Sequence, residues 1–171
     1  ALRPDPLAGA RRDREHLVER FGAFTIIMLV ESFVKTALTA TEEQMEGLDL
    51  ICLGGTFVIV FTLWWLYFGD VPVAGPPPGH RGHQAWVLVH LPLHLSIVGI
   101  AVGTARVALA EEDAVSPAVP YLAVPLVGAL VCLTILTLLS GSGRSGRVAV
   151  AQVVAAALVA IIGSAASASD V

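Results

Sequence analysis

The chain has 171 residues, of which 56% are hydrophobic and only 14% are charged, and its formal net charge is −4. Its mean hydropathy is +0.78, whereas a soluble domain has about a quarter of its residues charged. This composition excludes an ordinary soluble domain, and no basic patch with interleaved aromatic residues points to nucleic acid. The chain starts without Met and without a signal-peptide pattern, so we interpret it as a piece from inside a longer protein.

Five apolar runs have close to the roughly 20 residues that a helix needs to cross a bilayer. They are residues 21–40, 48–69, 85–110, 119–139 and 148–166. None has the alternating pattern of a membrane β-barrel strand, so all five are predicted to be helices. The sequence therefore predicts an all-α membrane protein, in which residues 1–20 form a juxtamembrane segment and residues 21–171 a bundle of about five transmembrane helices with short loops.

Charged residues outside these runs predict the orientation. The loops on the side of residue 1 contain arginines, whereas the loops on the opposite side contain Glu and Asp and neither Lys nor Arg. By the positive-inside rule, residue 1 lies on the cytoplasmic side and the C-terminus outside. The aromatic rings of Trp64, Trp65, Tyr67 and Trp86 are then expected at the cytoplasmic membrane boundary.

The first apolar run carries Glu31 near its middle and Lys35 one turn later. A charge at that depth costs several kcal/mol unless it is paired or hydrated, so it indicates a functional site. Lys35 either pairs with Glu31 or extends to the outer interface. Thr25, Ser32 and Thr36 form a polar stripe beside Glu31, and such hydroxyls usually bond the carbonyl four residues earlier. Glu31 itself is expected to face other helices rather than lipid.

The third run carries His90 and His94, which lie one turn apart on the same helix face. With a rise of about 1.5 Å per residue, His94 and Glu31 have similar depths. Glu31, Lys35, His90 and His94 are therefore the candidate polar site, either a proton relay or cation site or a hydrogen-bonded cluster that only fixes helix packing. Pro92 between the histidines frees the carbonyl of Leu88.

The remaining sequence features give little indication of a functional site. Cys52 and Cys132 are predicted to lie far apart, as free buried thiols. The spacing of His80 and His83 matches no zinc motif, and no catalytic motif or cofactor fingerprint is present. We therefore predict no metal, no cofactor and no enzymatic activity. Gly99-x-x-x-Gly103 predicts close approach of two helices.

Three segments resemble the bacterial low temperature requirement protein A (LtrA) family. HLVERFGAFTIIMLVES (16–32) is similar to its H-x-x-E-R-x-G-x-F-x-I-I-x-L-x-E block, LWWLYFGD (63–70) to its W-W-x-Y-F-D block, and HLPLHLSIVGIAVG (90–103) to its H-L-P-L-x-x-G-I-x-x-x-A-x-G block. The chain departs from these blocks at Gly69 and Ser96, and His94 lies outside the matched pattern. The resemblance implies the C-terminal part of a multi-pass protein of the bacterial inner membrane, without a defined biochemical activity.

The matched residues also suggest a second cluster towards the cytoplasmic boundary, made of His16, Glu19, Arg20, Trp65 and Asp70. Arg20 and Asp70 are predicted to form an interfacial ion pair between the first two spans. Two alternatives for this pair are a contact at the helix ends that sets topology and a catalytic role, of which the first is favoured.

Two main functions remain open from the sequence, and an intramembrane enzyme is a distant third. One is a proton- or ion-coupled transporter fragment in which Glu31 is the coupling group. The other is a non-transporting membrane scaffold or a protein of stress and cold tolerance. If Lys35 or a histidine lies close, Glu31 forms an ion pair; if not, it can exchange a proton. The predicted partners are the lipid bilayer and either the other half of a longer chain or a second copy.

Overall fold

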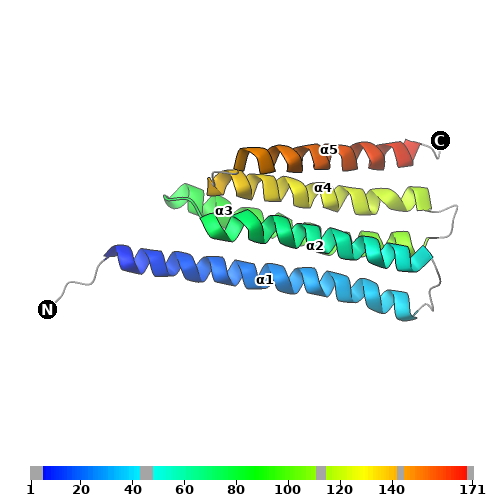
Figure 1. Cartoon of the computed structure of the whole chain (residues 1–171), viewed down its shortest axis with the longest axis horizontal. Coiled ribbons are helices and arrows are strands. Elements are labelled where there is room, and N and C mark those ends of the chain that lie inside the picture. Colours follow the sequence, from blue (N-terminus) through cyan, green and yellow to red (C-terminus); the bar gives the residue numbers. More distant parts are fainter. Residues whose placement is uncertain (1–5, 43–47, 111–114, 142–144, 169–171) are drawn as a thin grey trace.

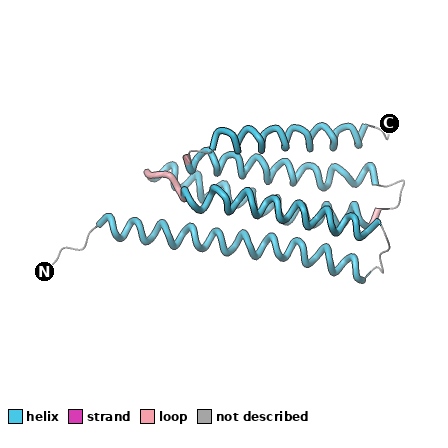
Figure 2. Tube along the Cα trace, in the orientation of Figure 1, coloured by secondary structure: helices cyan, strands magenta, loops and turns pink. Residues whose placement is uncertain are grey.

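The computed structural model describes residues 6–42, 48–110, 115–141 and 145–168. These residues form five helices that run side by side along one axis (Figures 1 and 2). The helices are α1 (Pro6–Glu42), α2 (Leu48–Ala74), α3 (His80–Ala108), α4 (Val115–Ser140) and α5 (Ser145–Ala168). No strand occurs among the described residues. The predicted all-α membrane bundle is thereby confirmed.

Four stretches of the described helices are long and apolar enough to cross a membrane: Asp13–Leu38, His80–Ala108, Pro117–Ser140 and Gly146–Ala166. In α2 the described apolar run is shorter, Leu53–Gly69. The span predicted there began at residue 48, and the side chains of residues 48–52 lie outside the described ones. Cys52 is among them, so the predicted separation of the two cysteines is not tested; Cys132 is a free, buried thiol.

The helices extend beyond the predicted spans. α1 begins at Pro6, so most of the segment expected to lie beside the membrane is helical. Between the predicted spans 48–69 and 85–110, the connection shortens to residues 75–79. Gly75, with φ of 61°, ends α2 and donates its N–H to the Val71 carbonyl at 3.0 Å. Gly79, with φ of 92°, precedes α3. Glycine adopts this left-handed backbone at little cost, so the turn is confined to the residues between these two positions.

α3 and α4 lie at the centre of the bundle. α3 contacts α1, α2 and α4, and α4 also contacts α2 and α5. Large apolar side chains lie both inside and outside: Leu93 of α3 is 1% exposed, whereas Leu91 and Leu95 are each 71% exposed. A soluble bundle rarely exposes contiguous apolar surface of this kind, so the outer face of α3 suits a hydrocarbon environment.

The contact between α3 and α4 depends on small residues. A Cβ atom on Gly99 would lie 2.7 Å from Cβ of Pro125, and one on Gly103 would lie 2.6 Å from Cα of Leu122. Real Cβ atoms do not approach so closely, so only glycine allows the two backbones to meet at this distance. The prediction of close helix approach at Gly99-x-x-x-Gly103 is confirmed.

Candidate functional site

His90 of α3 is completely buried and bonded on both ring nitrogens. Its Nδ1 lies 2.7 Å from the carbonyl oxygen of Trp86, and its Nε2 lies 3.0 Å from the hydroxyl of Tyr67 on α2. A carbonyl only accepts hydrogen bonds, so Nδ1 carries the proton and donates. In the neutral ring, Nε2 is then the acceptor, and the Tyr67 hydroxyl donates to it.

His94, one turn further along α3, is bonded to α1. Its Nε2 lies 3.0 Å from Oγ1 of Thr25, and Thr25 donates its own proton to the Phe21 carbonyl at 2.8 Å. The threonine oxygen can therefore only accept from His94, so Nε2 carries the proton. The same network argument thus assigns His90 and His94 opposite tautomers.

Aromatic rings surround the two imidazoles. The ring centroid of Phe21 lies 4.4 Å from that of His90, and the indole of Trp86 lies 4.2 Å from it. Phe24 meets His94 edge to face at 4.6 Å. The two imidazole centroids are 5.9 Å apart. The histidines are therefore neighbours in an enclosure that is apolar except for its hydroxyl and carbonyl partners.

Further hydrogen bonds continue along the contact between α1 and α3. The single proton of the Ser32 hydroxyl is shared with the Ile97 carbonyl at 3.3 Å, and the hydroxyls of Thr36 and Thr104 are 3.2 Å apart. Ser32 and Thr36 also bond the carbonyls four residues earlier, at 2.8 Å and 3.1 Å. The prediction that these hydroxyls bond their own helix is confirmed, and it explains why they can be buried cheaply.

Glu31 and Lys35 lie elsewhere. Their side chains are 59% and 68% exposed on the outer face of α1, with Oε1 of Glu31 3.6 Å from Nζ of Lys35. Within this chain Glu31 does not face the other helices as predicted, whereas the pairing of Lys35 with Glu31 was one of the two alternatives for that lysine. The stripe of Thr25, Ser32 and Thr36 occupies the inner face of α1 instead. The bond of His94 is to Thr25, so the four predicted residues do not form one site.

The predicted interfacial cluster is only partly described. His16 Nδ1 lies 3.8 Å from Oε2 of Glu19, and both side chains are largely exposed. Arg20 is exposed as well, and Trp65 is 63% exposed. The side chain of Asp70 lies outside the described residues, so the predicted ion pair between Arg20 and Asp70 is not tested.

Two of the four aromatic residues expected at the membrane boundary face the inside of the bundle. Tyr67 is 1% exposed and Trp86 is fully buried, whereas Trp64 and Trp65 are 39% and 63% exposed. A sequence signal for Tyr67 exists: Leu63, Tyr67 and Val71 recur every four residues and are all buried, which is the spacing of one helix face. Ring amphipathicity predicted a depth in the membrane and gave no information about this face.

The described residues include no group of three or more His, Cys, Asp or Glu side chains that could hold a metal ion. The arrangement around α3 is instead a chain of proton donors and acceptors. It can hold two imidazoles in fixed tautomers and link each of them to a different neighbouring helix.

Searches of curated proteins and of solved structures find no match to the chain. A comparison with protein families finds one, described as bacterial low temperature requirement A protein (LtrA), over residues 5–171. The match extends beyond the three segments that carried the resemblance, and it agrees with a multi-pass bundle of apolar helices. The chain belongs to the bacterial low temperature requirement A protein (LtrA) family.

Proposed function

We propose that this multi-pass membrane protein carries protons as part of a transporter, with His90 and His94 as the groups that bind them and Glu31 outside the path. One observation carries the proposal: two buried imidazoles on one face of α3, each 3.0 Å from a hydroxyl of a different helix. Ionisable groups inside a membrane bundle are costly and mark proton or ion pathways by default. The proposal assigns no enzymatic reaction and no cofactor.

The two histidines respond differently to an added proton. His90 would gain its proton on Nε2, which now accepts from Tyr67. Two donors would then face each other, so the tyrosine hydroxyl must turn and the contact between α2 and α3 must change. His94 would gain its proton on Nδ1, which leaves the bond from Nε2 to Thr25 intact. Proton binding at His90 is therefore the step that this geometry would couple to a movement of α2.

The test is proton flux in proteoliposomes that contain a pH-sensitive dye, under an imposed pH gradient. We expect His90→Gln to abolish flux and His94→Gln to reduce it strongly, because an amide can form hydrogen bonds but does not bind a proton at neutral pH. Glu31→Gln is the control and should retain flux. Full flux in well-folded His90→Gln protein, or loss of flux only in Glu31→Gln, would overturn the proposal.

A non-transporting scaffold is the second candidate, and one observation favours it. The space between Thr25, Leu29, Tyr67 and Leu93 is too small to hold a water molecule, so this part of the interior is closed. If the protein is a scaffold, His90→Gln should lower its stability, and neither the wild type nor the variant should transport protons. Wild-type proteoliposomes without any pH-driven flux, beside an intact bundle, would favour this function.

We also propose that the protein lies in the bacterial inner membrane with its arginine-rich side in the cytoplasm, because Lys and Arg in short loops are retained there. Gly146 and Leu109 fall at opposite ends of the helices in this orientation, and both are exposed. In intact cells, a membrane-impermeant thiol reagent should label Leu109→Cys and not Gly146→Cys. The reverse pattern would invert the orientation.

A protein partner on the outer face of α1 is a further part of the proposal. Glu31 and Lys35 are exposed among apolar side chains such as Ile27, Val34 and Leu38. An ion pair facing acyl chains is costly, so contact with a second copy or with another part of a longer chain would suit it better. Val34→Cys should form disulfide-linked dimers under mild oxidation if a second copy lies there, whereas a strictly monomeric product would exclude it.

A further inference from the structure

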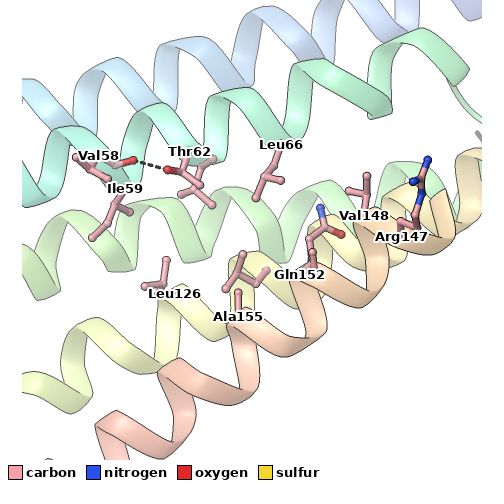
Figure 3. A pocket seen from close by; sticks show the side chains of 12 residues that line it. Val58, Ile59, Thr62, Leu66, Leu126, Arg147, Val148, Gln152 and Ala155 are labelled. Carbon is pink, nitrogen blue, oxygen red and sulfur yellow. Dashed lines mark hydrogen bonds between the residues drawn. The ribbon is translucent and has the colours of Figure 1, made fainter. Parts of the chain in front are cut away.

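A crevice of about 680 Å³ lies between α2 and α5, with α4 behind it (Figure 3). Its walls are largely apolar and include Ile59 and Leu66 of α2, Leu126 of α4 and Ala155 of α5. The volume is within the range of small-molecule sites. The crevice is separate from the histidines, so it needs its own explanation.

Gln152 of α5 is the unusual residue in this wall. It is 2% exposed, yet neither its amide nitrogen nor its amide oxygen has a hydrogen-bond partner among the described residues. In Figure 3 its side chain extends from α5 towards α2, near Leu66. An amide buried without a partner costs several kcal/mol in an apolar medium. A ligand that brings a hydrogen-bonding group into the crevice would remove that cost.

Arg147 provides a charge at one end of the crevice. It is exposed and lines the opening five residues before Gln152 on the same helix, which is about 7.5 Å along the helix axis. A guanidinium matches a phosphate group in geometry as well as in charge. From Arg147 inwards, the crevice therefore offers a cation, then an amide, then an apolar slot formed by Ile59, Leu66 and Leu126.

We infer that this crevice binds one anionic phospholipid from the leaflet on the arginine-rich side. The phosphate lies at Arg147, an ester carbonyl accepts from the Gln152 amide, and an acyl chain fills the slot between α2 and α5. The order of the three lining chemistries follows the order of headgroup, ester and acyl chain in such a lipid. Neither the proton-binding histidines nor transport activity enters this inference, so it stands independently of the proposed function.

The test is lipid retention by the purified full chain, measured by native mass spectrometry with added phosphatidylglycerol or phosphatidylcholine. The wild type should retain phosphatidylglycerol preferentially. Arg147→Gln should lower its affinity roughly tenfold, because a hydrogen bond to a charged group is lost, and Arg147→Lys should restore part of it. Gln152→Leu should weaken retention of both lipids, since both have ester carbonyls.

Two alanines of α5 form a matched pair of space-filling variants. Ala151 lines the crevice, whereas Ala157 is exposed and lies outside its lining. Ala151→Phe should block retention of both lipids, and Ala157→Phe should behave as the wild type. Gln152→Leu also reports on folding: no hydrogen bond to a described residue is lost, so its melting temperature without lipid should be unchanged or higher.

Three results would overturn the inference. The first is equal retention of the anionic and zwitterionic lipids by the wild type. The second is unchanged phosphatidylglycerol retention in folded Ala151→Phe protein. The third is a dimer that Ala151→Phe disrupts and Ala157→Phe does not, because the crevice would then be a contact between two copies of the chain rather than a lipid site.

Discussion

The two sides of the bundle are held together by different forces. α1 and α2 meet α3 through hydrogen bonds between side chains, from Thr25 to His94 and from Tyr67 to His90. α4 meets α3 and α5 through close packing of small residues: a Cβ on Gly103 would clash with Leu122, and one on Gly163 of α5 would lie 2.7 Å from Cβ of Ala123 of α4.

The two kinds of contact differ in how easily they can rearrange, which indicates where function can lie in such a bundle. In lipid, helices gain little from burying apolar surface against each other, so they associate by close packing or by polar contacts. A glycine-packed contact leaves no room for rearrangement. A hydrogen-bonded contact can exchange partners when a proton is added, so the side formed by α1, α2 and α3 is the one that can respond to pH.

The largest effect is expected from breaking the packed side. Gly103→Ile would place a branched side chain where a Cβ atom already lies 2.6 Å from Cα of Leu122. Overpacking of this kind costs about 3 kcal/mol or more, which should appear in SDS-induced unfolding in mixed micelles. The control is Gly54→Ile, because no atom of a described residue lies within 4 Å of a Cβ built on Gly54. A loss in Gly103→Ile no larger than in the control would contradict the close contact.

The next effect tests the hydrogen-bonded side. His90→Phe removes the imidazole acceptor 3.0 Å from the Tyr67 hydroxyl and should lower the unfolding free energy by about 1–3 kcal/mol, since the buried hydroxyl loses this hydrogen bond. Adding Tyr67→Phe removes that hydroxyl as well, so the double variant should be more stable than His90→Phe alone. A double variant that is less stable than the single one would show that the bond matters less than the shape of the two rings.

A smaller effect is expected at the outer end of the same contact. Thr36→Val removes the hydroxyl that lies 3.2 Å from Oγ1 of Thr104. Thr104 also donates within α3, to Ile100 or Ala101, with both carbonyls 3.0 Å away, so the loss should be only about 0.6 kcal/mol. Thr62→Val is the control, because exposed Thr62 bonds the Val58 carbonyl of its own helix at 2.7 Å. A loss above about 2 kcal/mol would indicate a stronger network than these two hydroxyls form.

The smallest effect is expected at the surface pair. Glu31→Gln removes an ion pair between side chains that are both more than half exposed, and Lys35 can extend towards the interface. The unfolding free energy of the isolated chain should therefore change by less than about 1 kcal/mol. Lys35→Met provides the reciprocal measurement. If Glu31→Gln lowers stability more than His90→Phe does, the comparison between the two sides of the bundle fails, because the critical polar contact would then lie on the outer face of α1.

The sequence alone determined the class of protein and most of its helices. Runs of about 20 apolar residues have few stable forms in a bilayer other than helices, so the membrane bundle followed directly. The local hydrogen bonds of Ser32 and Thr36 also followed, because the partner is always the carbonyl one turn earlier. The close approach at Gly99 and Gly103 could also be predicted, because a glycine has no side chain whatever its neighbours are.

The rotation of α1 about its axis depends on its packing against the other helices and could not be predicted from the sequence. Thr25, Ser32 and Thr36 face α3, whereas Glu31 and Lys35 face outwards, and consecutive residues such as Glu31 and Ser32 differ by about 100° around a helix. Hydropathy does not predict which face of α1 turns towards α3, because both the inner and the outer face meet apolar surroundings. Small hydroxyls satisfied within their own helix can be buried against α3, whereas a carboxylate there would lose its hydration. The same rotation brings His94 to Thr25.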